Sequence, residues 1–296
     1  MNRGEKESLC LEKVKAALFL NSQPCFKIDN ETFKKDYILY CDSNFHKNYF
    51  GLLKDEQIEF ANAIRTAQPN PSSNEFPDFI FDDGFIEHFQ ITSSQVTRKG
   101  SNQARKESDF RRKVDTETEK LETEWNETPS FDTVRSKSWS FQNPTHSRKF
   151  LIDSFKQNWE NHIDSKKRFA GKDRIGIFMV EHPENSLAMC ENIYYNWIDG
   201  MSNGDMRKQE IFHDYRLSRD KILLNYIYGF KNEIKYVIFV NLKRCEVIRT
   251  ENIPCLLQLM PWDYTILPMQ GRTETSIYNI SVPKSFMKGD KNNDKT

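Results

Sequence analysis

The sequence predicts an α/β fold in which a mixed central sheet is flanked by helices. Short runs of β-branched and aromatic residues alternate along the chain with longer segments of helical periodicity, as in α/β domains. The segment 77–94, PDFIFDDGFIEHFQITSS, contains two such runs joined through an Asp-Gly pair, which is a strong signal for a β-hairpin. The length of 296 residues allows one large domain or two small ones, with room for a buried core.

Before the hairpin, the pattern predicts a helix, a strand and a second helix. The first helix covers residues 5–20 and the strand covers residues 34–41, followed by an aromatic-rich loop over residues 44–50. Residues 52–67 have the clearer helical pattern, with Glu59 at the edge of the expected buried face. The prolines that follow cannot continue this helix, so a turn-rich connector leads into the hairpin.

Within the hairpin, the expected strands cover residues 79–81 and 85–92, and side chains of the second strand alternate between two faces. The mostly apolar face carries Phe85, Glu87, Phe89 and Ile91. The opposite face is a largely polar ladder of Ile86, His88, Gln90 and Thr92. With Asp78 at the start of the hairpin, this ladder is the most site-like arrangement in the chain. It is suited to hold a metal ion and a phosphate.

A long helix is expected over residues 102–126, with Ser101 as its N-cap. Its charge changes sign along its length, because basic residues dominate up to Lys113 and acidic residues follow. This order opposes the helix macrodipole, and an anion bound at the helix start would resolve the conflict. The candidates for binding a nucleic-acid backbone are Arg98, Lys99, Arg105 and Lys106. A solvated charged face is the alternative interpretation.

Residues 127–144 have no sustained period and are expected to form a linker or an ordered loop. The chain is therefore divided into a core with a helical lead-in over 1–126, this connector, an α/β region over 145–288 and a disordered tail over 289–296. In the α/β region, helices are expected over 145–168, 192–198, 209–230 and 256–260, and strands over 174–181, 235–240 and 245–250. These strands are candidates to complete the sheet of the hairpin.

Composition restricts function only weakly. Lys plus Arg and Asp plus Glu number 43 each, so the global charge favours neither nucleic acid nor membranes. No window approaches the ~18 uncharged apolar residues of a membrane span, and the N-terminus lacks a signal-peptide core, so a soluble cytoplasmic protein is expected. The six cysteines form no CxxC pair, which favours buried free thiols. No dinucleotide, nucleoside-triphosphate, serine-hydrolase or HExxH motif is present in the sequence.

Pro77-Asp78, a strand, a tight turn and a second strand with polar side chains two residues apart form a pattern that resembles the PD-(D/E)XK nuclease superfamily. The resemblance extends over about residues 50–125, through the helices on either side of the hairpin. It implies a restriction-endonuclease-like core, Mg²⁺ (or Mn²⁺) as cofactor and DNA as substrate. In that family two carboxylates hold the ion, and a lysine orients or activates the attacking water.

The resemblance implies Asp78 and Glu87 as metal ligands, with Glu59 as a candidate third acid. The family's lysine is missing from the second strand, since residue 89 is Phe. A Q-x-K variant of the motif would place Thr92 in the lysine's position, and a lysine moved to Lys99 or to the following helix is the other option. The candidates for positioning water and phosphate are Gln90, Thr92, Lys99 and His88, although a structural role is the alternative for His88.

Three functions remain open on this basis. The first is Mg²⁺-dependent hydrolysis of DNA phosphodiester bonds, and the second is a catalytically inactive module on the same fold that binds nucleic acid or protein. The third is a structural α/β protein whose polar ladder satisfies buried backbone groups. A homodimer is an open alternative to a monomer.

Overall fold

The computed structural model describes residues 3–21, 49–72, 75–97, 100–128, 134–171, 173–193, 208–212, 214–242, 244–260 and 264–280. The chain divides into two compact units. The first unit consists of Met1–Ser93 and His146–Met269, and the second consists of Ser94–Thr145 and Gln270–Thr296.

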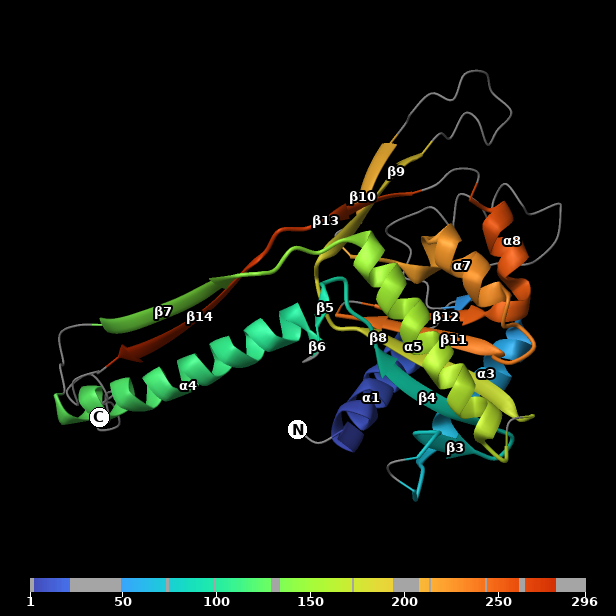
Figure 1. The fold of residues 1–296 in the computed structure, drawn as a ribbon, viewed down its shortest axis with the longest axis horizontal. Coiled ribbons are helices and arrows are strands. Elements are labelled where there is room, and N and C mark those ends of the chain that lie inside the picture. The colour runs from blue at the N-terminus through green and yellow to red at the C-terminus, as the bar shows by residue number, and fades with distance from the viewer. Residues whose placement is uncertain are drawn as a thin grey trace, which may run out of the picture. The chain divides into compact units, whose positions relative to one another are not determined.

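A seven-stranded mixed sheet forms the centre of the first unit, in the order β1-β12-β11-β8-β4-β3-β2. Its strands are β1 (Tyr49–Phe50), β2 (Gln68–Pro69), β3 (Phe79–Phe81), β4 (Gly84–Gln90), β8 (Ile175–His182), β11 (Tyr236–Asn241) and β12 (Cys245–Arg249). Figure 1 labels its strands β3, β4, β8, β11 and β12. β3 and β4 form the expected antiparallel hairpin, whereas β4, β8 and β11 run parallel to one another. The predicted mixed sheet is therefore confirmed, and strands from the C-terminal half join the sheet of the hairpin.

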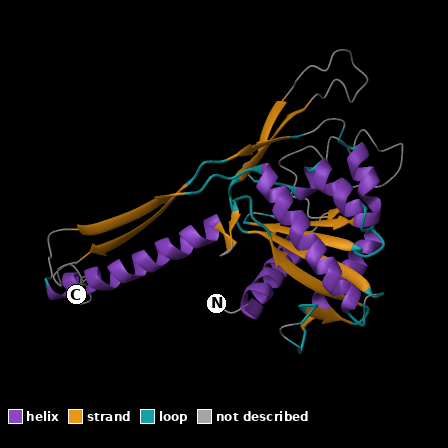
Figure 2. Ribbon diagram, in the orientation of Figure 1, coloured by secondary structure: helices purple, strands orange, loops and turns teal. Residues whose placement is uncertain are grey.

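Helices cover both faces of this sheet (Figure 2). Helices α1 (Arg3–Asn21) and α3 (Lys54–Thr66) each bury an apolar stripe against one face. The other face is covered by α5 (Arg148–Arg168), α7 (Lys221–Tyr228) and α8 (Ile253–Gln258), with the short 3-10 helices η1 (Leu217–Arg219) and η2 (Thr250–Asn252) between elements. Each face has its own apolar core, because alternate residues of every central strand point to opposite sides.

The central strands are apolar on both faces, as expected of parallel strands between two helical layers. In β8, Ile177 and Met179 belong to the core under α1 and α3, while Phe178 and Val180 belong to the core under α5. The Trp159 side chain of α5 is fully buried there, and its ring makes an edge contact with Phe178 at a centroid distance of 4.8 Å. The layered core therefore follows directly from the local patterns of strand and helix.

A three-stranded sheet also belongs to the first unit, in the order β10-β9-β13. It consists of β9 (Leu187–Ile193), β10 (Lys208–Phe212) and β13 (Thr265–Pro268). Two helical predictions were wrong in part here. Residues 209–212, the start of the helix expected over 209–230, lie in β10, whereas α7 confirms its later part. Residues 192–193 of the helix expected over 192–198 lie in β9, and residues 194–198 lie outside the described residues. β9 and β10 pair with each other along their length, and this pairing overrides local helical propensity.

The second unit contains the long helix α4 (Asn102–Glu127) beside a two-stranded ribbon of β7 (Val134–Gln142) and β14 (Arg272–Ile280). It also contains the short strands β5 (Val96–Thr97) and β6 (Gly100–Ser101). The predicted N-cap is confirmed, because the Ser101 hydroxyl accepts a hydrogen bond from the Ala104 N–H. The prediction of a linker or loop over 127–144 missed β7, whose residues are mostly exposed and polar. Trp139 is buried, Phe141 and Arg135 are half-buried, and Val134 is apolar but exposed.

Other expectations fall on parts of the chain that are not described. The strand expected over residues 34–41 and the tail over 289–296 lie outside the described residues, as does the expected loop up to residue 48. Residues 49–50, assigned to that loop, instead form β1. Among the described helices, none has an apolar stretch long enough to cross a lipid bilayer.

Candidate functional site

Polar side chains gather where the parallel strands β4 and β8 end. Gln90, the last residue of β4, is paired in register with Glu181 near the end of β8. Side chains of His88 and Gln90 lie on the face that α1 covers, since they are two and four residues beyond the buried Ile86 of that face. Glu181 lies on the same face, two residues after Met179. In open α/β sheets, ligands bind outside the carboxyl ends of parallel strands.

The Glu181 carboxylate is the centre of this group, and its side chain is only 9% exposed. Oε2 accepts a hydrogen bond from Gln90 Nε2 at 2.7 Å and lies 3.3 Å from His88 Nε2. Oε1 lies 3.4 Å from the Lys13 ammonium, which comes from α1 and whose side chain is 58% exposed. A neutral His88 that donates to this carboxylate must carry its proton on Nε2.

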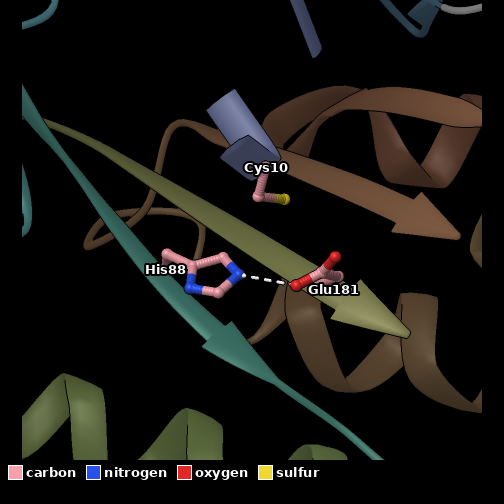
Figure 3. Close-up of side chains that lie close together, drawn as sticks. All are labelled: Cys10, His88 and Glu181. Atoms are coloured by element: carbon pink, nitrogen blue, oxygen red, sulfur yellow. Dashed lines mark hydrogen bonds and ion pairs between the residues drawn. The ribbon is translucent and has the colours of Figure 1, made fainter. Parts of the chain in front are cut away.

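Cys10 of α1 completes the group, as Figure 3 shows. One ligand atom from each of Cys10, His88 and Glu181 lies within 4.8 Å of the others, and all three residues are buried. Within the described part of the chain, no other set of three His, Cys, Asp or Glu side chains is close enough to share a metal ion. We refer to these three residues as the Cys-His-Glu cluster.

The cluster favours the ionised form of the Glu181 carboxyl group and the protonated form of the Cys10 thiol. Burial disfavours the charged form of Glu181, but hydrogen bonds from His88 and Gln90 outweigh it, and the pKa falls to about 2. Burial raises the pKa of the Cys10 thiol, and the charge of Glu181 raises it further. At neutral pH and without a metal ion, the cluster therefore contains a carboxylate beside a protonated thiol.

The predicted metal ligands Asp78 and Glu87 form hydrogen bonds that connect the two strands of the hairpin. The Asp78 N–H donates to Glu87 Oε2 at 3.0 Å, and Asp78 Oδ2 accepts from the His88 N–H at 2.8 Å. Glu87 Oε1 lies 2.7 Å from His162 Nδ1 of α5. Glu87 is buried and faces α5, so strict alternation does turn it away from His88 and Gln90, as the sequence indicates. Asp78 and Glu87 thus order the hairpin on which His88 lies.

The structure does not bring Glu59 to this group. Its carboxylate pairs with Lys235 and accepts a 3.4 Å hydrogen bond from the Tyr236 hydroxyl. Tyr236 is in register with Ile177 at the beginning of β8, whereas Glu181 is in register with Val240. Glu59 therefore lies at the amino end of the parallel strands, and the Cys-His-Glu cluster lies toward their carboxyl end.

Thr92 belongs to a second polar network, centred on Glu184. Glu184 Oε1 accepts from the Thr92 hydroxyl at 2.5 Å, and Oε2 accepts from the Ser93 N–H and hydroxyl at 2.8 Å each. His146 and His182 lie 3.6 and 3.5 Å from the same carboxylate. Burial opposes the charge on Glu184, yet these donors lower its pKa to about 2. Ser93 is fully buried, so its hydroxyl is not accessible as a nucleophile. This network instead holds the loop after β4 in place.

The residues predicted to bind nucleic acid either belong to the second unit or lie outside the described residues. Arg98 and Lys99 lie outside the described residues. On α4, Arg105 is exposed and donates to Asn102 Oδ1 at 3.0 Å, and Lys106 lies 3.4 Å from the carbonyl oxygen of Gln142 in β7. The basic first half of α4 is thus a helical face next to the ribbon.

A surface cavity of about 690 Å³ lies elsewhere on the first unit. Its lining includes Ile80, Glu75 and Arg168. Ile80 pairs with Phe85 in the amino-terminal half of β4, so the cavity is not at the carboxyl ends of the strands. We therefore base the site on the polar cluster and not on the cavity.

Comparisons of the chain with protein-family models, with curated proteins and with solved structures returned no match.

Three site residues were not anticipated from the sequence: Glu181, Cys10 and Lys13. Glu181 had a local signal, because it is an acid at the end of the apolar run RIGIFMVE. Cys10 and Lys13 had none, since they meet β8 only through the packing of α1 on the sheet.

Proposed function

We propose that this protein is a metal-dependent, nuclease-like hydrolase of DNA phosphodiester bonds, with its reacting centre at the carboxyl ends of β4 and β8. One observation carries the proposal: the ionised Glu181 carboxylate is surrounded by His88, Gln90 and the Lys13 ammonium. A carboxylate and an imidazole are ligands for a metal ion, and an adjacent ammonium attracts a phosphate. The resemblance to PD-(D/E)XK nucleases, which rests on Pro77-Asp78, a strand, a tight turn and polar side chains two residues apart on the next strand, supports the same location.

Each residue has a role set by its contacts. Lys13 projects into solvent from the edge of the cluster, so its ammonium is available to a phosphate oxygen and to the charge that develops there. Gln90 is exposed and donates its amide N–H to Glu181, which leaves its amide oxygen to accept a hydrogen bond from the attacking water. With a pKa of about 2, Glu181 is too weak a base to remove a proton efficiently and serves as a charged ligand.

Asp78 acts as a positioning residue in this proposal. Its carboxylate accepts a hydrogen bond from the backbone N–H of His88, so it sets the strand position from which the imidazole reaches Glu181.

Hydrolysis adds water to phosphorus and breaks one P–O ester bond, and the leaving oxygen takes up a proton. A bound metal ion would supply the Lewis acid for this step. The expected Mg²⁺ fits the donor set poorly, because Mg²⁺ prefers oxygen ligands and the cluster offers one carboxylate beside nitrogen and sulfur.

Plasmid cleavage tests this proposal. Wild-type protein is incubated with supercoiled DNA and Mg²⁺, Mn²⁺ or Zn²⁺ in turn, beside the variants Glu181→Gln, Lys13→Ala and Asp78→Ala. The matched control is Glu75→Gln, which changes an exposed carboxylate outside the cluster. We expect a loss of about 100-fold or more in Glu181→Gln and Lys13→Ala, and full activity in the control. Equal cleavage by wild type and Glu181→Gln would exclude the proposed centre.

A second candidate function is DNA binding without turnover. The observation that favours it is the burial of Thr92, which a Q-x-K variant of the motif would put in the lysine's position but which donates its hydroxyl to Glu184. The basic half of α4 would then carry the binding. Its signature is salt-dependent DNA binding that needs no metal, survives Glu181→Gln and weakens in Arg105→Ala with Lys106→Ala.

A further inference from the structure

We propose that Cys10, His88 and Glu181 form a binding site for one transition-metal ion of the Zn²⁺ class, with Cys10 Sγ as thiolate ligand. The inference deepens the proposed function by naming the ion at its centre, and it is tested by metal binding alone. It differs from the Mg²⁺ site that the sequence pattern implies, in both the ligands and the ion.

The geometry of the cluster suits a tetrahedral ion. Ligands at ~2.0–2.1 Å from a tetrahedral Zn²⁺ are separated from each other by about 3.3 Å, and pairs that include sulfur are somewhat wider. His88 Nε2 and Glu181 Oε2 are 3.3 Å apart, and the Sγ atom of Cys10 is within 4.8 Å of its chosen partner atoms. An ion can therefore replace the proton shared between imidazole and carboxylate with little movement of either side chain, and Cys10 Sγ, now within 4.8 Å, would bind at about 3.6 Å from these atoms.

The chemistry of the donors also separates Zn²⁺ from Mg²⁺. Thiolate and imidazole are ligands of borderline and soft ions, whereas Mg²⁺ selects oxygen atoms and retains several waters. Three positions around the ion would be taken by buried side chains, so Mg²⁺ would have to give up most of its water shell, which it does reluctantly. An ion also compensates the cost of a buried thiolate, because a coordinated thiol loses its proton.

The site has three protein ligands and one side that leads to solvent. Gln90 and Lys13 border Glu181 there, and both are exposed. Three protein ligands with a fourth position for water or substrate are the pattern of catalytic zinc sites, whereas structural zinc sites use four. The inferred site therefore fits an ion that meets a phosphate or water beside Lys13.

The three ligands come from α1, β4 and β8, which are far apart in sequence (Figure 3). An ion at this position ties α1 to the two strands. Because the unfolded chain does not keep these ligands together, metal binding stabilises the folded state, and the melting temperature rises with metal concentration.

The experiment uses the full chain, purified with a chelator and titrated with Co²⁺, Zn²⁺ or Mg²⁺. Co²⁺ reports the ligand directly, since thiolate coordination produces a charge-transfer absorption band in the near ultraviolet. We expect the band to saturate at one equivalent, to disappear on addition of Zn²⁺ and to be absent in Cys10→Ser. The control Cys255→Ser changes a free cysteine of α8, on the opposite side of the sheet, and should keep the band.

Two further measurements keep the inference testable if Cys10→Ser folds poorly. Calorimetry of the wild type should show Zn²⁺ binding about 100-fold tighter than Mg²⁺ binding, and His88→Gln should weaken Zn²⁺ binding by about 100-fold. A Co²⁺ band that persists in Cys10→Ser, or Zn²⁺ binding no tighter than Mg²⁺ binding, would overturn the inference. Zn²⁺ binding without DNA cleavage would support this metal site and contradict the proposed hydrolase function. Mg²⁺-dependent cleavage without Zn²⁺ binding would support the hydrolase function and contradict this metal site.

Discussion

Replacement of Glu184 by Gln removes the charge that holds the loop after β4 in place. The carboxylate accepts hydrogen bonds from Thr92 and from two groups of Ser93, and its side chain is 7% exposed. Gln keeps the size of the side chain but is neutral at every pH. The substitution therefore removes the charge together with one of the two accepting oxygens, and only the charge contributes a dependence on pH.

The size of the effect follows from the pKa. In the folded protein the donors around Glu184 lower the pKa from 4.5 to about 2, against the opposing effect of burial. A difference of about 2.5 pH units corresponds to about 3 kcal/mol of stability at 1.36 kcal/mol per unit. Because the folded pKa is depressed, this stability is fully present above pH 4.5 and is lost as the pH falls toward 2.

Urea denaturation followed by circular dichroism measures the free energy of unfolding of wild type and Glu184→Gln between pH 7 and pH 2. We expect the variant to be about 3 kcal/mol less stable at pH 7, with the difference shrinking steadily below about pH 4.5. The control Glu75→Gln, at an exposed carboxylate, should follow the wild type at every pH. A difference between wild type and Glu184→Gln that is unchanged from pH 7 to pH 2.5 would refute the reasoning.

Three further substitutions test the packing around the sheet. Trp159→Ala empties the core under α5 and should cost about 3–5 kcal/mol in urea denaturation; a cost under 1 kcal/mol would show that the ring is not buried. Gly84→Ala places a Cβ against the carbonyl oxygen of Ile175, closer than real Cβ atoms approach, so we expect a lowered melting temperature, and an unchanged one would contradict that close approach. Asp220→Ala removes the N-cap of α7 and the partner of Arg148, and calorimetry should show a loss of about 3 kcal/mol, whereas a neutral result would mean that neither contact stabilises the fold.

Local patterns in the sequence were enough to predict much of the fold. The Asp-Gly turn and the alternation that follows it predict the β3–β4 hairpin and the facing of Glu87, because both depend on neighbouring residues. The apolar stripe of α5 and the apolar runs of β8 and β11 also depend only on neighbouring residues, so these elements could be predicted as well. β7 and β14 were missed, since a mostly exposed ribbon of two strands has no continuous apolar face to reveal its period.

The candidate site depends on contacts that no local pattern contains. The sequence by itself determined that His88 and Gln90 share a strand face, because side-chain direction alternates along any strand. Only the tertiary structure decided what they meet, since the parallel pairing of β4 with β8 puts Glu181 beside Gln90 across ninety-one residues of chain. The packing of α1 then adds Cys10 and Lys13. Long-range pairing and helix packing are driven by burial of apolar surface, and the polar cluster forms where those apolar contacts bring the strand ends together.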